Sequence, residues 1–200
     1  MKHALLMLAL CYLLVETCNA ETKKTVDQSA LDGTWAMNCD PSLLTGIRVN
    51  FKNGQYKSSV TKYRDSKCKV AQYKFLAKGT YKLTEQTAGA EHSFDYDVFP
   101  TEVKILPFTK EAAEAFRKQS FCGISDWEAK KLVDSRLCKK NDLSGKTCYG
   151  KAKIERGMLY TTMKSDANDC TSAAKRYVLF DADHPWYRTD EIMPADIFAN

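Results

Sequence analysis

The sequence is 200 residues long, 44% hydrophobic, and carries a formal net charge of +5 at pH 7. This length is enough to bury one sizeable core. The lysines are scattered rather than gathered into a dense basic patch with interleaved aromatics, which argues against a nucleic-acid partner.

The chain begins with the pattern of a secretory signal peptide. A short, positively charged segment over residues 1–3 precedes an apolar run over residues 4–15, and small residues end at Ala20. We predict a signal peptide over residues 1–20 with cleavage after Ala20. The run is short for a transmembrane anchor, and neither Cys11 nor Cys18 fits a lipid-attachment box. We therefore expect a secreted or periplasmic protein, with no stable membrane span after signal removal, and leave open which of the two compartments it occupies.

Six cysteines follow the predicted signal peptide: Cys39, Cys68, Cys122, Cys138, Cys148 and Cys170. An even number in an exported chain predicts disulfides. We expect neighbours in the sequence to pair, with Cys39–Cys68 the firmest bond and with Cys122–Cys138 and Cys148–Cys170 open to exchange. No C-x-x-C pair or zinc-like Cys/His spacing occurs, so no metal is expected.

Alternating apolar and polar residues predict the first strands. Residues 33–39 and 47–52 each place apolar side chains on one face. Asn53-Gly54 is a strong hairpin signal, and residues 56–63 return as a third strand.

The longest alternation runs over residues 72–84. Tyr73, Phe75, Ala77, Gly79, Tyr81 and Leu83 share one face, with lysines on the other. Thirteen residues is long for a strand, and Gly79 on the apolar face allows a sharp bend. Such a coiled strand, with one wet face and one aromatic face, is typical of a small closed barrel.

The second half of the chain alternates less regularly. Residues 94–105 alternate with an apolar parity that shifts after Pro100, which indicates a bulge or a break in the strand. Thr109 caps a short helix with apolar residues Ala112, Ala113 and Phe116. Residues 148–154 and 158–163 form a hairpin, and residues 177–180 are expected to be the closing strand. No linker or repeat divides the chain, so residues 21–200 are predicted to be one domain.

Gly33-Thr34-Trp35, in the first predicted strand, resembles the G-x-W signature of lipocalins and their calycin relatives. In that family the tryptophan closes the barrel floor, and an arginine from the last barrel strand packs over it. The resemblance implies that Trp35 and Arg176 form this floor, because Arg176 directly precedes residues 177–180. The second lipocalin signature, a T-D-x-x motif, is absent.

The order of several motifs also resembles small exported proteins of Gram-negative predatory bacteria of the Bdellovibrio group. The motifs are G-T-W-x-x-x-C from Gly33, Y-x-D-x-x-C from Tyr63, G-x-Y from Gly79 and C-G-x-x-x-W from Cys122. Pattern and resemblance together predict a mainly β protein, an antiparallel lipocalin-like β-barrel with one or two short helices and disulfides. An open Greek-key sandwich is the alternative.

Enzymatic motifs are missing from the sequence. His92 and His184 have no neighbour that would make either a base beside a nucleophile, and no phosphate-binding glycine run occurs. Asp181, Asp183 and His184 form a candidate cation site, although a solvated polar loop is the favoured interpretation. We expect a protein that is not an enzyme and has no cofactor.

Binding in the barrel is therefore the favoured function. We expect a small apolar or amphipathic ligand in the barrel interior, with wall candidates Phe51, Tyr73, Phe75, Tyr81 and Phe94. The alternative is a secreted protein-binding module, an inhibitor or adhesin, whose barrel loops bind a protein or cell-surface partner. A structural envelope component is a third class. An open interior would favour the carrier, and a filled interior would favour the binding module.

Purified mature protein should begin at Glu21 and contain no free thiol under denaturing conditions, because an exported chain oxidises its paired cysteines. N-terminal sequencing and thiol titration check both points. A retained signal segment, or reactive thiols at all six positions, would contradict the prediction.

Overall fold

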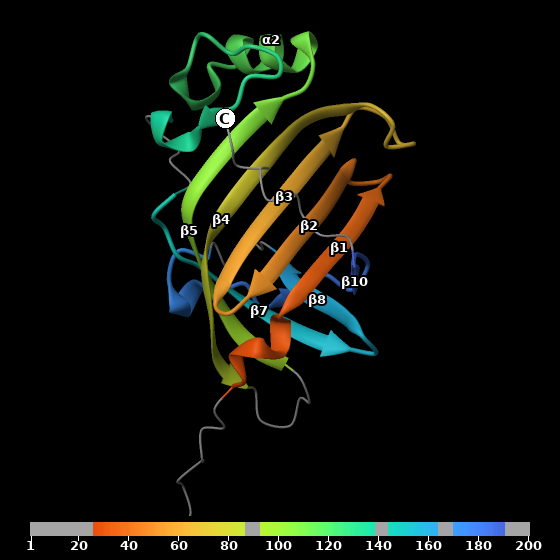
Figure 1. Ribbon diagram of the computed structural model, residues 1–200, viewed down its shortest axis with the longest axis vertical. Helices are drawn as coiled ribbons and strands as arrows, with labels where there is room; N and C mark the ends of the chain where they lie inside the picture. The colour runs from red at the N-terminus through yellow and green to blue at the C-terminus, as the bar shows by residue number, and fades with distance from the viewer. Residues whose placement is uncertain (1–25, 87–92, 139–143, 164–169, 191–200) are drawn as a thin grey trace, which may run out of the picture.

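The computed structural model describes residues 26–86, 93–138, 144–163 and 170–190, and the predicted signal peptide and His92 lie outside them. Figure 1 shows strands with one α-helix at the upper end. The strands are β1 (Gly33–Asp40), β2 (Thr45–Lys52), β3 (Gln55–Tyr63), β4 (Ala71–Gln86), β5 (Ser93–Pro107), β6 (Val133–Asp134), β7 (Cys148–Glu155), β8 (Met158–Met163), β9 (Leu179–Phe180) and β10 (Trp186–Arg188). The helices are α2 (Lys110–Lys118) and the short 3-10 helices η1 (Gln28–Leu31), η2 (Phe121–Gly123), η3 (Ser135–Leu137) and η4 (Ala173–Lys175).

The strands form an antiparallel sheet that closes on itself. Their order is β10-β1-β2-β3-β4-β5-β7-β8-β9, and β10 pairs with β8 as well as with β1. Eight strands therefore make a closed ring, and β6 and β9 lie outside it. The predicted antiparallel, lipocalin-like barrel is confirmed, and closure rules out the open sandwich.

The strand that closes the ring differs from the prediction. Only Leu179–Phe180 of residues 177–180 form a strand, β9, which pairs with β8 at the edge of the ring. Closure comes from β10, where Arg188 lies opposite Trp35 and Trp186 lies opposite Leu159. A three-residue strand has too few positions to show alternation, so the sequence gives no signal for it.

A bulge couples the two longest strands. Gly79 of β4 lies opposite Pro100 of β5, and the register shifts between Lys78 and Gly79. Because the shift adds one residue to β5, Val98 and Val103 both face into the barrel despite their odd spacing. Of the two predicted alternatives at Pro100, a bulge or a break, the structure contains the bulge.

Two separate clusters of buried side chains fill the two ends of the barrel. The lower cluster, toward η1, contains Leu31, Trp35, Val49, Phe51, Tyr56, Tyr81, Leu83, Phe94, Ala152 and Leu159. The upper cluster, toward α2, contains Ile105, Ala113, Phe116, Cys122, Trp127, Val133 and Cys138. In the upper cluster the Phe116 ring lies 4.7 Å from Phe121 and 4.9 Å from Trp127, centroid to centroid.

Three disulfides hold the turns and the irregular segments. They join Cys39 to Cys68, Cys122 to Cys138 and Cys148 to Cys170, so all three predicted pairings are confirmed. The Cys122–Cys138 bond encloses a segment whose regular structure is limited to η2, β6 and η3. Disulfides of small exported domains each stabilise the fold by about 2–5 kcal/mol.

Trp35 and η1 close the lower end of the barrel. The Trp35 side chain is 1% exposed, and its Nε1 donates a hydrogen bond of 2.8 Å to the carbonyl oxygen of Leu31. The Tyr81 hydroxyl donates to an Asp32 carboxylate oxygen at 2.8 Å, and the Leu83 backbone N–H donates to the Gln28 side chain. These bonds attach η1 to β1 and β4, so η1 covers the lower end of the barrel.

The predicted contact between Arg176 and Trp35 is wrong. The arginine over Trp35 is Arg188, whose guanidinium carbon lies 4.8 Å from the ring centroid. Arg188 reaches this position because it lies directly opposite Trp35 in the β1–β10 ladder. The lipocalin-like arrangement of an arginine from the last barrel strand is present, but the last strand lies further along the chain than residues 177–180.

Arg176 lies instead on the outer face of the barrel wall. It is 8% exposed and bonds to Asp97 at 2.6 Å, to Asp95 at 3.2 Å and to the Gly150 carbonyl oxygen at 2.8 Å. Asp95 and Asp97 alternate with the inward-facing Phe94 and Tyr96, so they point away from the core. Arg176 therefore fastens the segment after Cys170 to β5 and β7.

Gly79→Ala should destabilise the protein by about 3 kcal/mol, near the upper end for overpacking. A Cβ at this position would lie 2.0 Å from the Phe99 carbonyl oxygen, and backbone cannot move aside as a side chain can. Chemical denaturation measures the change. Gly46→Ala is the control, because its Cβ would meet its nearest atom at 3.4 Å, and equal losses at both positions would contradict the prediction.

Trp35→Ala should destabilise by about 3–5 kcal/mol, because loss of a buried ring leaves a cavity. Arg188→Ala should couple to it by about 0.5–1 kcal/mol, since the two side chains share one contact. Arg176→Ala should add to Trp35→Ala without coupling, because the two residues lie on opposite faces of the wall. Urea unfolding of the single and double variants tests this, and coupling to Arg176 instead of Arg188 would refute it.

Candidate functional site

The upper parts of β1–β5 extend beyond the closed ring. The pairings that complete the ring use Trp35 and Ala36 of β1 and Ser93–Val98 of β5. Beyond them, the register aligns one side chain from each of five strands on the inner face, which we call the inner-face row: Met37, Ile47, Val60, Phe75 and Ile105. An apolar row thus crosses the sheet between the lower and upper clusters.

The middle of the inner-face row is only half-buried. Met37 and Ile105, at its two ends, are 8% and 0% exposed. Ile47, Val60 and Phe75 between them are of intermediate exposure, as is Ala77 one step lower. Apolar side chains that face inward and still contact solvent form a surface on which an apolar molecule gains by burial.

The structure separates the five predicted wall residues into two groups. Phe51, Tyr81 and Phe94 belong to the packed lower cluster, where the Phe51 and Tyr81 rings lie 4.9 Å apart. Tyr73 and Phe75 are half-buried and pack against the upper cluster, with Tyr73 5.1 Å from Phe116. Only this second pair borders the half-buried surface.

Ile47 and Val60 complete this surface and were not among the predicted wall residues. Each alternates in phase with the aromatic positions of its neighbours, since Ile47 lies opposite Val60 and Val60 opposite Phe75. The alternation was visible in the sequence, but the pairing register that unites these residues was not.

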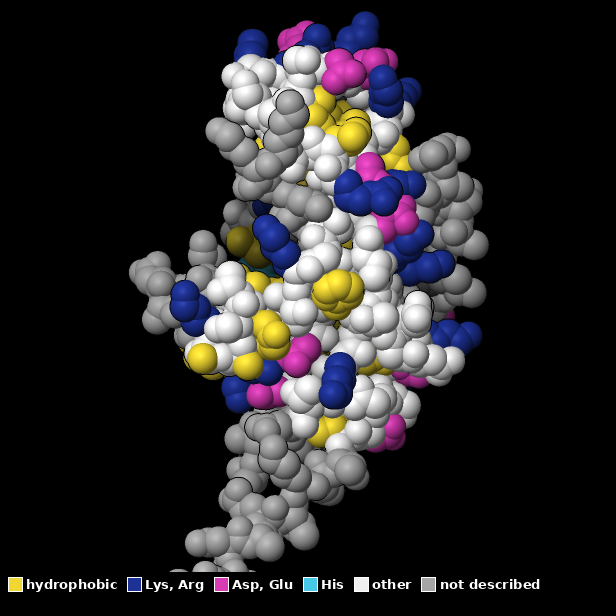
Figure 2. Space-filling view, turned by 90° about the vertical axis from the view of Figure 1, so that its left-hand side faces the viewer, with side chains coloured by type: hydrophobic (Ala, Val, Ile, Leu, Met, Phe, Trp, Pro, Cys, Tyr) yellow, Lys and Arg dark blue, Asp and Glu magenta, His cyan; other side chains and the backbone are white. Residues whose placement is uncertain are grey.

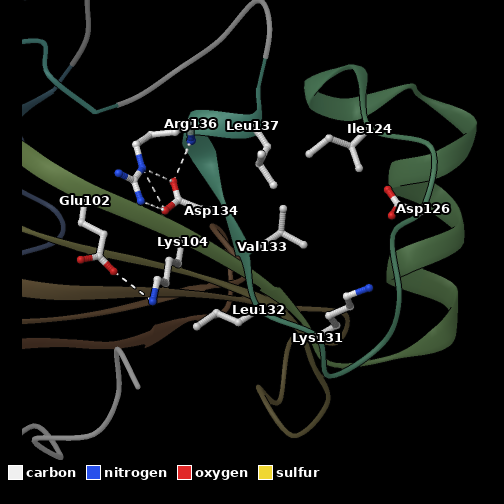
Figure 3. A pocket seen from close by; sticks show the side chains of 10 residues that line it. All are labelled: Glu102, Lys104, Ile124, Asp126, Lys131, Leu132, Val133, Asp134, Arg136 and Leu137. Atoms are coloured by element: carbon white, nitrogen blue, oxygen red, sulfur yellow. Dashed lines mark hydrogen bonds and ion pairs between the residues drawn. The ribbon is translucent and has the colours of Figure 1, made fainter. Parts of the chain in front are cut away.

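A separate pocket lies outside the barrel, beside β5 and β6. Its volume is about 400 Å³, and Figure 3 shows apolar side chains between charged ones. Ile124, Leu132, Val133 and Leu137 supply the apolar lining, and Leu137 is 62% exposed. The cations at its edge are already engaged, since Lys104 pairs with Glu102 at 3.0 Å and Arg136 with Asp134 at 2.6 Å.

Charges of both signs are interspersed on the side of the molecule shown in Figure 2. Hydrophobic side chains form small separate patches there rather than one broad band. Among the described residues visible on this face, neither apolar nor basic side chains form a continuous surface.

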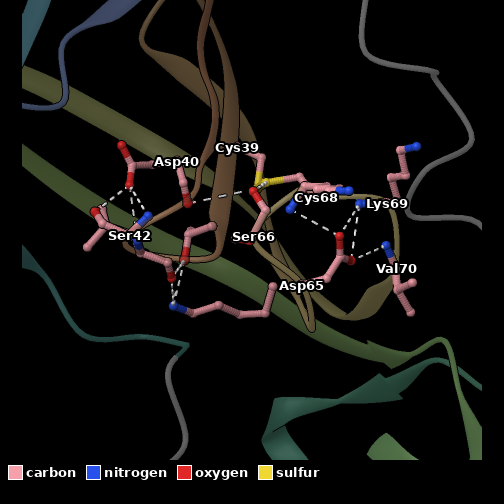
Figure 4. The surroundings of a disulfide bond; sticks show 12 residues. Cys39, Asp40, Ser42, Asp65, Ser66, Cys68, Lys69 and Val70 are labelled. Atoms are coloured by element: carbon pink, nitrogen blue, oxygen red, sulfur yellow. Dashed lines mark hydrogen bonds between the residues drawn. A yellow bond between two sulfur atoms is a disulfide. The ribbon is translucent and has the colours of Figure 1, made fainter.

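The Cys39–Cys68 disulfide lies at the upper end of β1–β3, where the strand connections meet (Figure 4). The Asp65 carboxylate accepts backbone N–H bonds from Lys67, Lys69 and Val70, and these bonds, that from Val70 above all, lower its pKa. Near the end of β3 the Lys62 ammonium donates to Thr45 Oγ1 of β2 at 2.5 Å and to the Leu43 carbonyl oxygen at 3.3 Å. Local polar contacts and the disulfide thus join the segments of this rim.

His184 connects the segment between β9 and β10 to the end of β1. Its Nδ1 lies 2.7 Å from Asp181 Oδ1, and its Nε2 lies 3.5 Å from Asp40 Oδ2. The hydrogen bond with Asp181 raises the pKa of His184, so the ring is protonated to higher pH than a free histidine. In the described part of the chain no group of three or more metal-ligating side chains comes together. The three candidate residues thus do not form a cation site in the structure: Asp181 and His184 form an ion pair and Asp183 is exposed.

Among the described residues, no helix is both long and apolar enough to cross a membrane.

Comparison with known proteins identifies the family. A search of curated proteins finds none that matches. A model of the family described as Adenomatosis polyposis coli down-regulated 1 matches residues 11–179, a span that includes β1 to β8, all three disulfides and the whole inner-face row. Neither result supports the resemblance to exported proteins of predatory bacteria. Because the match covers most of the chain, the protein belongs to the Adenomatosis polyposis coli down-regulated 1 family.

Proposed function

We propose that this protein is an exported, non-enzymatic binding protein that holds a small apolar or amphipathic ligand against the inner-face row. The observation that carries the proposal is the half-buried state of Ile47, Val60 and Phe75 on the inner face of the sheet, just above the closed ring. In a completely filled barrel these positions would be as buried as Ile105, which is 0% exposed.

Burial supplies the driving force for such binding. Each Å² of apolar surface removed from water contributes about 25 cal/mol, and a ligand in contact with several of these side chains buries its own surface as well. The walls are fixed in advance by the β-ladders and the Cys39–Cys68 disulfide, so little ordering entropy opposes binding.

The lower cluster limits where the ligand sits. Phe51, Tyr81 and Phe94 are 3–4% exposed and belong to the same buried cluster as Trp35. They are therefore residues of the hydrophobic core and not of the ligand site. The ligand site therefore lies above the ring, between the two clusters, and is bordered by Tyr73 and Phe75 of the five predicted wall residues. Three disulfides support the exported location.

A protein-binding module remains the second candidate. It is favoured by the pocket beside β6, where Leu137 is 62% exposed above an apolar lining with charged edges. A protein partner with one apolar side chain and flanking charges fits such a surface, because interface anchors commonly insert into pockets with polar rims.

Phe75→Ala should weaken ligand affinity by about tenfold while costing less stability than Phe51→Ala. Phe75 borders the half-buried surface, whereas Phe51 is packed in the lower cluster, where removal of a ring costs about 3–5 kcal/mol. Titration with a fluorescent apolar probe and thermal unfolding, run on both variants, separate the two effects.

The wild-type protein decides between the two candidates. Saturable one-site probe binding that lipid displaces, or a small molecule found by native mass spectrometry after purification, supports the carrier. Absence of any probe binding by the folded wild type would refute it. The Leu137→Ser variant is the matched control, because it alters the outer pocket and should leave probe binding unchanged.

A further inference from the structure

The row of side chains above the inner-face row contains a lysine. The register aligns Thr45, Lys62, Tyr73 and Pro107 across β2–β5, one alternation step beyond Ile47, Val60, Phe75 and Ile105. Lys62 therefore shares the inner face with the apolar surface, and two residues of strand place it about 7 Å from Val60. Of the eight side chains at these aligned positions, Lys62 alone is charged, and the other seven are apolar or neutral.

Lys62 keeps its charge unpaired. An ammonium has three N–H donors, and Lys62 uses two of them on neutral acceptors, Thr45 Oγ1 at 2.5 Å and the Leu43 carbonyl oxygen at 3.3 Å. Within the described residues no carboxylate lies in ion-pair range of it. The acidic residue nearest in register, Asp40, is engaged elsewhere, by Ser42 at 2.5 Å and by His184 at 3.5 Å.

Tyr73 adds a second polar group to the same edge. It lies directly opposite Lys62 in the β3–β4 ladder and is half-buried. Burial raises the pKa of Tyr73, so its hydroxyl stays neutral and remains a hydrogen-bond donor. Within the described chain this hydroxyl has no hydrogen-bond partner.

We propose that the ligand is a long-chain carboxylate, whose acid group binds Lys62 and whose hydrocarbon chain lies along Val60, Ile47 and Phe75. This inference rests on the proposed function and names the chemistry of its ligand. A half-buried ammonium with a free donor favours an anion, because charge-assisted hydrogen bonds are stronger than neutral ones. The neutral tyrosine hydroxyl opposite supplies a second donor to the same group, while the apolar row excludes a fully polar anion.

The test compares two probes, 11-(dansylamino)undecanoic acid and its methyl ester, which lacks the negative charge and carries one extra methyl group. Wild-type protein should bind the acid at least tenfold more tightly. Lys62→Met keeps the length of the side chain and removes its charge, so it should lower acid affinity about 10- to 100-fold and leave ester affinity within threefold. Tyr73→Phe should weaken acid binding severalfold.

Lys57→Met is the matched control, because Lys57 lies on the same strand with its side chain exposed on the outer face. Lys62→Arg keeps the charge and should keep the preference for the acid, which covers the case in which the methionine variant unfolds. Equal binding of acid and ester by the wild type, or an unchanged preference in Lys62→Met, overturns this inference while the carrier function stands. Failure of the wild type to bind either probe removes the carrier function itself.

Discussion

The close approach of Gly79 to the backbone of Phe99 and Pro100 is the constraint on which the barrel depends. The Phe99 carbonyl oxygen occupies the place that the Cβ of any other residue would need. The backbones of β4 and β5 can therefore approach this closely only because residue 79 is a glycine. Below this contact, β5 pairs with β7 and the ring closes through β8 and β10. Above it, β5 pairs with β6 and supports α2. One glycine thus divides the sheet into a closed lower part and an upper part of different construction.

This division explains why the core is fully covered in the lower half of the sheet and only partly covered in the upper half. In the lower half, strands surround the core on every side, and η1 covers the end with hydrogen bonds to β4. In the upper half, α2 and the disulfide-linked loop pack on β4 and β5, while the inner faces of β2 and β3 have less cover. The half-buried side chains are found on those two strands and at Phe75 beside them. The candidate site is a consequence of uneven cover over a regular sheet.

Local alternation in the sequence was sufficient to predict most of the fold. The first five strands, the hairpin of β7 and β8, the bulge at Pro100, the helix after Thr109 and the three cysteine pairings depend on neighbours in the chain, and the structure contains them. The features that escaped prediction depend on distant pairing. Arg188 reaches Trp35 only because β10 is the last strand of the ring, and its three residues have no periodic signal. The candidate site was predicted in part for the same reason. The alternation of apolar and polar residues placed Tyr73 and Phe75 on the inner face. Only the pairing register of the strands shows that Ile47, Val60 and Lys62 lie beside them.

The position of β10 also determines when during synthesis the barrel can exist. The ring is a pairing of β1, near the start of the described chain, with residues 186–188, near its end. During synthesis the chain emerges N-terminal end first, so β1–β5 are available to pair as a sheet with two free edges before β10 appears. Trp35 has no covering arginine in that interval, and the edge of β1 is open to any other strand. The edge of β1 therefore stays unpaired on the β10 side until the final residues of the barrel arrive.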